Sequence, residues 1–419
     1  MKEWFDVVPS RRGTASVKWD ERPDVLPLWI ADMDFPAAPC IREALQRKLD
    51  QGVFGYTKVP ESYFEATIRW FGRRHGWRIG RESIIPIEGL VPAASVAIKA
   101  LTAPGDGVII QTPAYNCFFS SIRNTGCVLL ENKMLYDGAD GSYRLDFEDF
   151  ERRCADSRAK AFLLCNPHNP SGRLWSREEL QRLWEICRCH GIPVISDEIH
   201  CDIVPPGSSY TPFASLSEEA AERSISFVSP SKPFNIAGLC IANIIAACPE
   251  YRRRLDRVIN DWEHCDVGQF GPAALEAAWS PEGEAWLDEM NAYVHDNYLY
   301  LRERFARECP ACTVTPLDAT YLVWIRIDRL GATGTETETG TETETAATGS
   351  PRFSTGSLLT GKEVEEFLLK EEKVWVNGGQ LYGDDRFIRI NIACPRSTLT
   401  EALDRILRGL GRLDGMRRL

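Results

Sequence analysis

The sequence lacks any long run of apolar residues and lacks an excess of positive charge. No segment approaches the about 20 consecutive apolar residues that cross a bilayer, and residues 1–6 contain no apolar core of a secretory signal. Lys and Arg number 49 against 60 Asp and Glu, which gives a net charge of −11. An acidic balance without a basic stripe argues against binding to nucleic acid. We therefore expect a cytoplasmic protein that binds neither a membrane nor a nucleic acid.

Signals for a metal site or a disulfide framework are also sparse, although the chain has 14 cysteines. One CxxC motif is present, Cys309-Pro-Ala-Cys312, but no second CxxC and no nearby histidine pair accompanies it to complete a zinc site. Many other cysteines lie in apolar runs, where cysteine behaves as a small hydrophobic residue. The pattern predicts reduced, structural thiols and no bound metal.

What the sequence does contain is a series of short apolar runs separated by amphipathic segments. The runs are continuous rather than alternating, as in strands that are covered on both faces. They span residues 107–111, 161–165, 193–196, 224–228 and 241–246. Residues 176–187 have helical periodicity, and Ser176 with Glu179 forms a plausible capping box. Strands and helices that alternate predict an α/β domain with a mainly parallel sheet.

After about residue 280 the pattern changes to a long helix over 283–308, short strands such as 321–328, and a final helix. We interpret this part as a smaller α+β domain, since 419 residues are enough for two domains. The predicted organisation is an N-terminal segment (1–45) that joins the small domain, a large domain (46–282) and the small domain (283–419). A low-complexity stretch rich in Thr and Glu, at about 331–355, is predicted to be a disordered surface insertion.

Polar or aromatic residues follow four of the predicted strands at the point where each strand ends. Tyr115 follows the first, the segment 166–172 the second, Asp197 the third, and Ser229-Pro-Ser-Lys232 the fourth. In open α/β sheets, ligands bind outside the carboxyl ends of the strands. A lysine and an acid at two such ends are what pyridoxal phosphate (PLP) needs, because lysine forms a Schiff base with it and an acid keeps its pyridine nitrogen protonated. This pair makes PLP chemistry the leading hypothesis.

Each of these residues also has an ordinary structural interpretation. A single lysine after a strand is usually a solvated loop residue, and Asp197 alone could be a helix N-cap. Tyr115 could be a packing aromatic, His200 a core histidine, and the two Asn-Pro pairs in 166–170 turn residues. We favour the functional interpretation because the structural ones together require a coincidence at every strand end.

Several stretches of the chain resemble the fold type I PLP enzymes, the aspartate aminotransferase superfamily of class I/II. The matching stretches are 12–20, 26–35, 54–57, 166–172, 197–200, 231–238 and 388–396. The Asn-Pro-His-Asn-Pro, Asp-Glu-x-His and Ser-Lys matches belong to the superfamily. The stretch Trp29-Ile-Ala-Asp-Met-Asp-Phe35 is similar to the MalY/PatB-type cystathionine β-lyases, which are carbon–sulfur lyases. The resemblance implies a large domain with a mainly parallel, seven-stranded sheet sandwiched by helices, beside the smaller α+β domain.

The resemblance also implies a PLP site. Lys232 would bind the cofactor covalently and later act as the base on the substrate Cα. Asp197 would pair with the pyridine nitrogen, and Tyr115 would stack on the ring. The other implied cofactor contacts are Asn169 and His200 at the phenolic oxygen, and Gly89, Leu90, Val91, Ser229 and Ser231 at the phosphate, where a helix N-terminus favours an anion. Tyr56 would reach the phosphate of the neighbouring subunit, so that the implied enzyme is a homodimer.

The implied substrate is a small amino acid. Arg389 would bind its α-carboxylate as a bidentate pair, with Asn169 beside it and the backbone of Trp29 to Ala31 on the other side. The resemblance favours β-elimination from L-cystathionine or a related cysteine S-conjugate to a thiol, pyruvate and ammonia. Aminotransfer stays open as the alternative, because the same motifs serve both reactions. A PLP sensor without catalysis is a third hypothesis, and it would require a DNA-binding extension.

Two residues depart from the family pattern. Cys240 stands where aspartate aminotransferases place an arginine on the phosphate. Pro233 follows Lys232 and removes a backbone donor next to it. We expect these departures to alter cofactor affinity at most.

Overall fold

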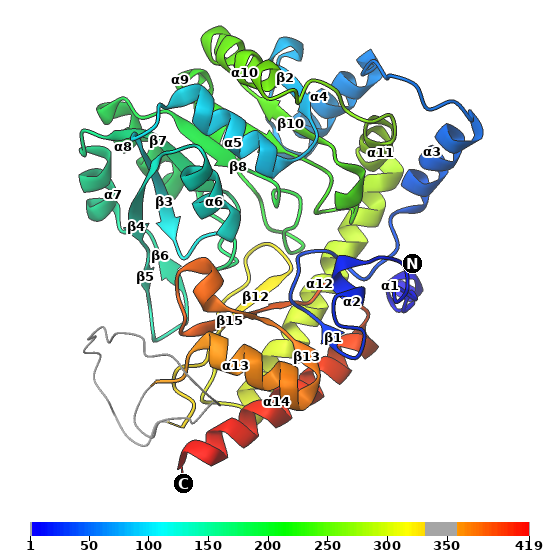
Figure 1. Cartoon of the computed structure of the whole chain (residues 1–419), viewed down its shortest axis with the longest axis vertical. Helices are drawn as coiled ribbons and strands as arrows, with labels where there is room; N and C mark the ends of the chain where they lie inside the picture. Colours follow the sequence, from blue (N-terminus) through cyan, green and yellow to red (C-terminus); the bar gives the residue numbers. More distant parts are fainter. Residues whose placement is uncertain (1, 332–357, 419) are drawn as a thin grey trace.

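The chain folds around a seven-stranded sheet and a smaller four-stranded sheet, with the long helix α12 extending from one to the other (Figure 1). The computed structural model describes residues 2–331 and 358–418. The predicted insertion at about 331–355 therefore lies outside the described residues, apart from Gly331.

The large sheet has the strand order β2-β10-β9-β8-β7-β3-β4. Its strands are β2 (Ile84–Ile87), β3 (Gly107–Thr112), β4 (Val128–Lys133), β7 (Ala159–Cys165), β8 (Val194–Asp197), β9 (Ser224–Val228) and β10 (Ala242–Ile245). Strand β10 pairs antiparallel with both of its neighbours, and the other pairs are parallel. The prediction of a mainly parallel, seven-stranded sheet is confirmed. The five apolar runs are β3, β7, β8, β9 and β10.

Helices cover both faces of this sheet. Successive strand residues point to opposite sides, so the apolar strands present hydrophobic side chains on both faces. Val108 and Ile110 of β3 belong to a core cluster with residues of α5 and α10, whereas Ile109 belongs to a cluster with residues of α7 and α8. The helices of this part are α3 (Pro39–Asp50), α4 (Glu61–His75), α5 (Leu90–Leu101), α6 (Asn116–Asn124), α7 (Phe147–Cys154), α8 (Arg177–His190), α9 (Glu218–Glu222), α10 (Pro249–Asp261) and α11 (Phe270–Ala278), with a hairpin of β5 (Leu135–Tyr136) and β6 (Tyr143–Arg144). Helix α8 begins with the predicted capping box of Ser176 and Glu179.

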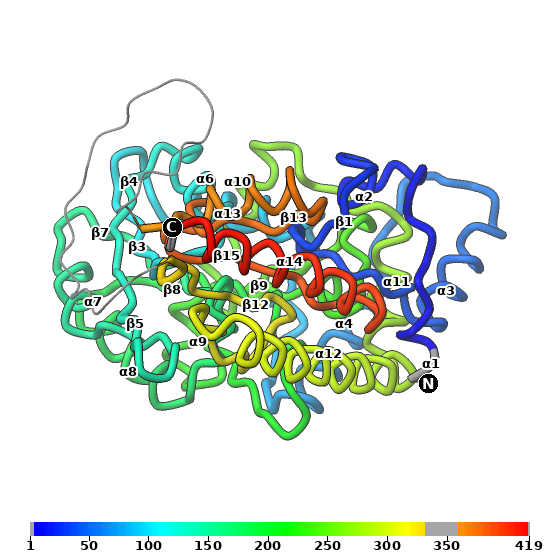
Figure 2. Tube along the Cα trace, turned by 90° about the horizontal axis from the view of Figure 1, so that it is seen from below, coloured from blue at the N-terminus to red at the C-terminus, as the bar shows by residue number. Residues whose placement is uncertain are grey.

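The four-stranded sheet has the order β11-β12-β15-β14 and is antiparallel where its strands pair. The elements of this part are α12 (Pro281–Glu308), β11 (Thr313–Val314), β12 (Leu322–Arg326), α13 (Gly361–Phe367), a π-helical turn (Leu368–Glu372), β13 (Val374–Trp375), β14 (Asn377–Gly378), β15 (Phe387–Asn391) and α14 (Arg396–Arg418). Helices α12 and α14 run side by side under the small sheet (Figure 2). Helix α12 starts two residues earlier than predicted, because Ser280 caps it and Pro281 occupies its first turn.

The N-terminal segment lies against the small sheet. It contains α1 (Lys2–Phe5), α2 (Val17–Asp20) and β1 (Leu26–Pro27), and β1 pairs parallel with β13. The Asn391 amide of β15 donates to the carbonyl oxygens of Ile30 and Asp32, at 2.7 Å each. The domain boundaries near residues 45 and 282 stay predictions.

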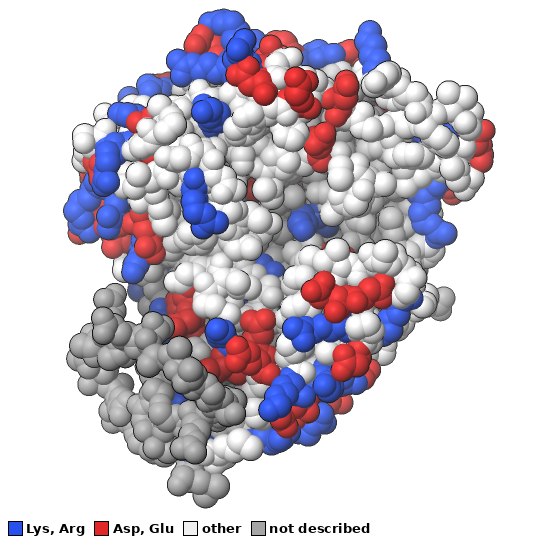
Figure 3. All heavy atoms as spheres, in the orientation of Figure 1, with Lys and Arg blue, Asp and Glu red and all other residues white. Residues whose placement is uncertain are grey.

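The charged surface is mixed in sign. On the face that Figure 3 shows, acidic and basic side chains are interspersed and form no basic stripe. Among the described residues, no helix is both long enough and apolar enough to cross a bilayer.

Candidate active site

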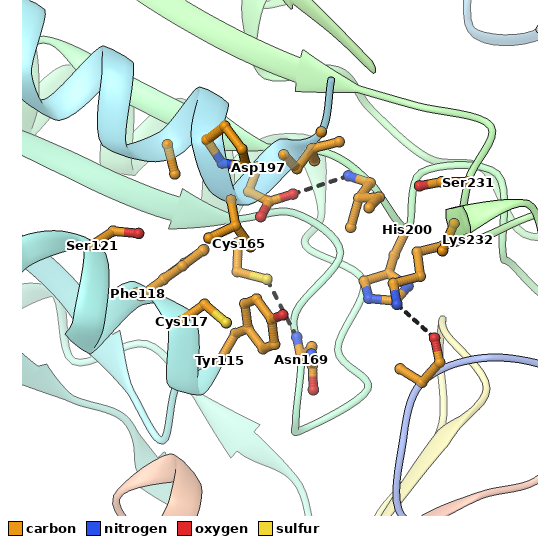
Figure 4. A pocket seen from close by; sticks show the side chains of 18 of the residues that line it. Tyr115, Cys117, Phe118, Ser121, Cys165, Asn169, Asp197, His200, Ser231 and Lys232 are labelled. Atoms are coloured by element: carbon orange, nitrogen blue, oxygen red, sulfur yellow. Dashed lines mark hydrogen bonds between the residues drawn. The ribbon is translucent and has the colours of Figure 1, made fainter. Parts of the chain in front are cut away.

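A cavity of about 370 Å³ lies at the carboxyl ends of the parallel strands, between the large sheet and the N-terminal segment. Ten residues of the predicted site line it: Ala31, Gly89, Leu90, Val91, Tyr115, Asn169, Asp197, His200, Ser231 and Lys232. Figure 4 shows that Lys232 and Asp197 approach the cavity from different elements, with His200 near Lys232. The structure therefore brings together residues that lie up to 201 positions apart in the chain, as the contact of Lys232 with Ala31 shows.

Lys232 follows β9 and directs its ammonium group into the cavity. Its Nζ donates to the carbonyl oxygen of Ala31 at 2.5 Å. Burial lowers the pKa of this lysine to about 8, and the positive charge of Arg389 adds to that effect. The carboxylates of Asp32 and Asp197 act in the opposite direction. Lys232 can thus lose its proton near neutral pH, as a base on carbon requires.

Asp197 is the last residue of β8 and is 6% exposed. Its Oδ1 accepts from the backbone N–H of Ile199 at 3.2 Å. Burial raises the pKa of this carboxyl group to about 6, while the bond from Ile199 and the charge of Lys232 lower it. The residues after Asp197 form turns rather than a helix, so Asp197 is not a helix N-cap. A carboxylate of this kind, buried at a cavity wall, can pair with a protonated ring nitrogen.

His200 and Asn169 border the same cavity. Burial, with the charges of Lys232 and Arg389, lowers the pKa of His200 to about 3, so its imidazole is neutral. Its Nδ1 is buried and has no partner among the described residues. The Asn169 backbone N–H donates to Cys165 Sγ at 3.4 Å, which holds the 166–172 loop against the end of β7. An unpaired ring nitrogen at the cavity wall can bond a polar group of a bound ligand.

The phosphate of a cofactor would find donors at the start of α5. Gly89 is the N-cap of this helix and no side chain caps it, so the first-turn N–H groups are free for an anion. Ser231 lines the cavity beside them, and so does Cys240 at the position of the missing arginine. Ser229 is different, because its hydroxyl donates to the carbonyl of Ile241 at 2.7 Å and accepts from Ser231 N–H. It holds the lysine loop in shape, and its predicted phosphate contact gains no support from this geometry.

Arg389 lies on β15 beside the cavity and is 4% exposed. Its Nη1 donates to Asn169 Oδ1 and its Nη2 to the carbonyl of Trp29, both at 3.0 Å. Its Nε is buried and has no partner among the described residues. The guanidinium therefore bridges the large sheet and the N-terminal segment, at the place where a substrate carboxylate is expected.

Ala31 lines the cavity opposite the sheet, and side chains hold most of the carbonyl groups of the segment from Trp29 to Phe35 that contains it. Tyr321 donates to Ala31 O at 3.1 Å, and Asn235 donates to Met33 O and Phe35 O. Neither residue has a role that the sequence alone predicts. Asn235 lies in a stretch that matched the family, and Tyr321 opens a predicted strand, but neither pattern indicates which carbonyl group it contacts.

Tyr56 is not near this cavity within the chain. Its side chain is fully exposed (102%), next to the exposed Val53 and Phe54. Its predicted role at the site of a second subunit stays a prediction.

Comparisons with known proteins identify the family of the chain. The family model for aminotransferase class I and II matches residues 23–406. Cystathionine beta-lyase PatB of Bacillus subtilis is 38% identical over 96% of this chain and 98% of its own length. The protein MalY of Escherichia coli is 30% identical over 95% of this chain and 96% of its own.

Solved structures show the same fold. Cystalysin from Treponema denticola, which contains a pyridoxal 5′-phosphate cofactor, superposes with a TM-score of 0.88 at 33% identity, over 98% of this chain and 99% of its own. A PLP-bound protein of Clostridium difficile named as an aminotransferase also has a TM-score of 0.88, at 34% identity, over 97% of this chain and 99% of its own.

The chain belongs to the aminotransferase class I and II family of PLP-dependent enzymes. The predicted family and cofactor are thereby confirmed. The residues also fit the cofactor chemically: a lysine with a lowered pKa, a buried carboxylate, an unpaired ring nitrogen and an uncapped helix N-terminus surround one cavity.

Proposed function

We propose that the protein is a PLP-dependent carbon–sulfur β-lyase that cleaves L-cystathionine or related cysteine S-conjugates to a thiol, pyruvate and ammonia. The observation that carries this proposal is the convergence of Lys232 and Asp197 on one cavity, beside Arg389. The full-length similarity to PatB, a cystathionine beta-lyase, supports this choice of reaction within the family.

Each residue has a proposed task toward the cofactor. Lys232 would bind it covalently, Asp197 would pair with the ring nitrogen, and Tyr115 would cover one ring face. His200 and Asn169 would lie at the phenolic oxygen, and the first turn of α5 with Ser231 would hold the phosphate. PLP bound in this way withdraws electrons from the substrate Cα, so that the Cα–H becomes acidic.

Lys232 then removes the proton from the substrate Cα, and Ala31 and Asp197 assist. Lys232 with a pKa of about 8 is partly neutral at physiological pH and takes the proton from Cα. Ala31 O holds the Nζ atom on the side of the N-terminal segment. The ionised Asp197 keeps a positive charge on the ring nitrogen because it is buried and can form a charge-assisted hydrogen bond there.

Arg389 orients the substrate. Two of its nitrogen atoms are held by Asn169 and Trp29, and it lies over the ring of Tyr382 with 4.6 Å to the ring centroid. These contacts leave little rotational freedom, so the guanidinium is preorganised for a carboxylate. Trp29 stacks on Trp375 with 4.3 Å between centroids, which covers this side of the site.

The fate of the substrate decides between lyase and aminotransferase. When Cβ carries a sulfur substituent, a thiolate leaves after Lys232 has removed the Cα proton. With PLP bound, Lys232 could instead return the proton to the cofactor, which would keep the amino group and release the substrate as a keto acid. The similarity to the Clostridium difficile protein named as an aminotransferase makes aminotransfer the second candidate.

A homodimer is part of the proposal. Val53, Phe54 and Tyr56 expose 75%, 58% and 102% of their surface. Three such residues within four positions form an apolar strip that a second copy of the chain would cover. Tyr56 of that copy would then contact the cofactor phosphate, as in the implied family arrangement.

The deciding experiment measures pyruvate and free thiol released from L-cystathionine by the PLP-loaded protein. We expect equal amounts of pyruvate and homocysteine, and a loss of about 10³-fold or more in Lys232→Ala. The exposed Lys160→Ala serves as the matched control and should keep full activity. Formation of a keto acid only when an amino-group acceptor is supplied would instead identify an aminotransferase.

A further inference from the structure

The CxxC motif that the sequence analysis set aside as structural lies outside the active-site cavity, in a β-turn at the end of α12. Cys309 is the C-cap of this helix, and the backbone N–H of Cys312 donates to the carbonyl of Cys309 at 3.0 Å. Pro310 occupies the second turn position, where its fixed φ favours this geometry. A turn of this kind keeps the two Cα atoms within about 7 Å, near the range that a disulfide requires.

The two thiols also face each other. Their Sγ atoms are 3.4 Å apart, and both cysteines are free in the structure. A disulfide needs about 2.05 Å between the sulfur atoms, so closure requires a small side-chain adjustment and no new backbone path. Cys309 and Cys312 are 5% and 7% exposed, while Pro310 between them is exposed. The turn thus lies at the surface, with the two buried thiols directly beneath its exposed proline.

The two thiols differ in how readily they ionise. The contact between the two Sγ atoms lowers the pKa of Cys309 and raises the pKa of Cys312. A thiol that ionises more readily beside a second thiol has the arrangement of an attacking and a resolving cysteine.

A metal site is less well supported. A zinc site needs further ligands beyond two cysteines. Within residues 2–331 and 358–418, the one cluster of three His, Cys, Asp or Glu side chains with metal-like spacing is His75, Cys201 and Asp202. That cluster is elsewhere, and Asp202 is already bonded to Trp70 and His75 and paired with Arg74.

We propose that Cys309 and Cys312 are a reversible dithiol–disulfide site that reacts with low-molecular-weight disulfides. The Cys309 thiolate attacks one sulfur of the external disulfide and releases one thiolate. The Cys312 thiolate then attacks Cys309 Sγ, forms the intramolecular bond and releases the second thiolate. The two protein thiols are oxidised, the external disulfide is reduced to two thiols, and the two protein protons pass to them. The site is independent of the proposed lyase reaction.

The test equilibrates the full-length, PLP-loaded protein in buffers with different ratios of reduced to oxidised glutathione. The remaining thiols are then alkylated, and the labelled peptides are identified by mass spectrometry. We expect Cys309 and Cys312 to lose their labels together, with a mass decrease of two hydrogen atoms, and to regain them in the reducing buffers. Labels that persist on both cysteines in the most oxidising buffer would overturn the proposal.

Three variants test whether the bridge forms between Cys309 and Cys312 and in the proposed order. Cys312→Ser should leave Cys309 as a stable mixed disulfide with glutathione, and Cys309→Ser should abolish bridge formation. Cys187→Ser is the matched control, because Cys187 is also buried and contacts a second cysteine, Cys154, and it should leave the bridge unchanged. Loss of the bridge in Cys187→Ser, or stoichiometric protection of Cys309 and Cys312 from alkylation by added Zn²⁺, would contradict the proposal.

Discussion

Two buried aspartates, one at the strand ends of the large sheet and one in the N-terminal segment, differ in the number of hydrogen bonds that their carboxylates accept. Asp34 of the N-terminal segment is 3% exposed and accepts from Arg11 at 2.8 Å, Lys18 at 2.8 Å and Trp19 at 2.7 Å. Asp197 at the end of β8 is similarly buried, but the one described hydrogen bond to its carboxylate comes from Ile199 N–H. Burial raises the pKa of Asp197 to about 6.

The difference separates a structural charge from a reactive one. A buried carboxylate with three donors has its solvation replaced by the protein, so it holds its neighbours in place. A buried carboxylate with one donor keeps acceptor capacity for a ligand and makes the free protein less stable. The N-terminal segment therefore supplies a rigid wall, whereas the strand ends supply the groups that await the cofactor.

The first prediction concerns the structural charge of Asp34. Asp34→Ala leaves the buried Lys18 and the partly buried Arg11 with one partner fewer, since both contact this carboxylate. We expect the free energy of unfolding to fall by about 3–5 kcal/mol, measured by urea unfolding of the cofactor-free chain. The exposed Asp24→Ala, which removes a surface pair with Lys373, is the control and should change it by less than about 1 kcal/mol. Equal effects of the two substitutions would refute the comparison.

The second prediction concerns the reactive charge of Asp197. Its removal should change the free energy of unfolding in the opposite direction. The folded-state pKa of Asp197 is about 6, above its ordinary value of 3.8, so stability is lost as the pH rises from about 4 through 6. Asp197→Asn should therefore stabilise the cofactor-free chain at pH 7 by about 2–3 kcal/mol and flatten this pH dependence.

The same substitution should weaken PLP binding, because an amide cannot keep the ring nitrogen protonated. Urea unfolding between pH 4 and 7 and PLP titration at pH 7 measure the two effects. Asp34→Asn is the matched control and should destabilise the chain. A destabilised Asp197→Asn chain would show that Asp197 is a structural charge like Asp34.

The reactive half of this comparison could be predicted from the sequence, and the structural half could not. Lys232, Asp197 and Tyr115 each lie at the end of an apolar run or within a few residues after it, and parallel strands bring their ends to one edge. Asp34 and Arg11 lie 23 positions apart without helical or strand periodicity between them. No local rule pairs such residues, although Asp34 lies within a stretch that resembled the family and Arg11 borders another.

Local sequence patterns also left one helix boundary wrong. The start of α12 was predicted too late because Ser280 and Pro281 precede the first apolar residue of the helix. The phosphate contact of Ser229 stays a prediction. Its hydroxyl donates to the Ile241 carbonyl and accepts from Ser231 N–H in this structure, and no sequence pattern indicates those contacts.

The third prediction concerns Arg389, which contacts both regions. Arg389→Lys keeps the charge but cannot donate to Asn169, Trp29 and a carboxylate in one plane. We expect kcat/KM for the amino-acid substrate to fall about 30-fold, corresponding to about 2 kcal/mol, mainly through KM. Steady-state kinetics with Arg386→Lys as control, a residue paired with Asp384 at the surface, checks this. An equal loss in both variants would remove Arg389 from the substrate site.

The last prediction uses the lysine itself to sharpen the comparison. Only neutral Lys232 can bond to PLP, and burial together with Arg389 places its pKa at about 8. The rate at which the cofactor-free chain takes up PLP should therefore rise about tenfold per pH unit below pH 8 and level off above it. Stopped-flow absorbance measures this rate.

Arg389→Gln removes the positive charge that lowers the lysine pKa, so the plateau should move to higher pH. Arg389→Lys retains the charge and should leave the plateau near pH 8, which separates charge from hydrogen-bond geometry. A rate that keeps rising to about pH 10, the value of an ordinary lysine, would mean that Lys232 is solvated in the free protein. The charged groups at the strand ends would then not differ from the structural charges of the N-terminal segment in the way that the comparison requires.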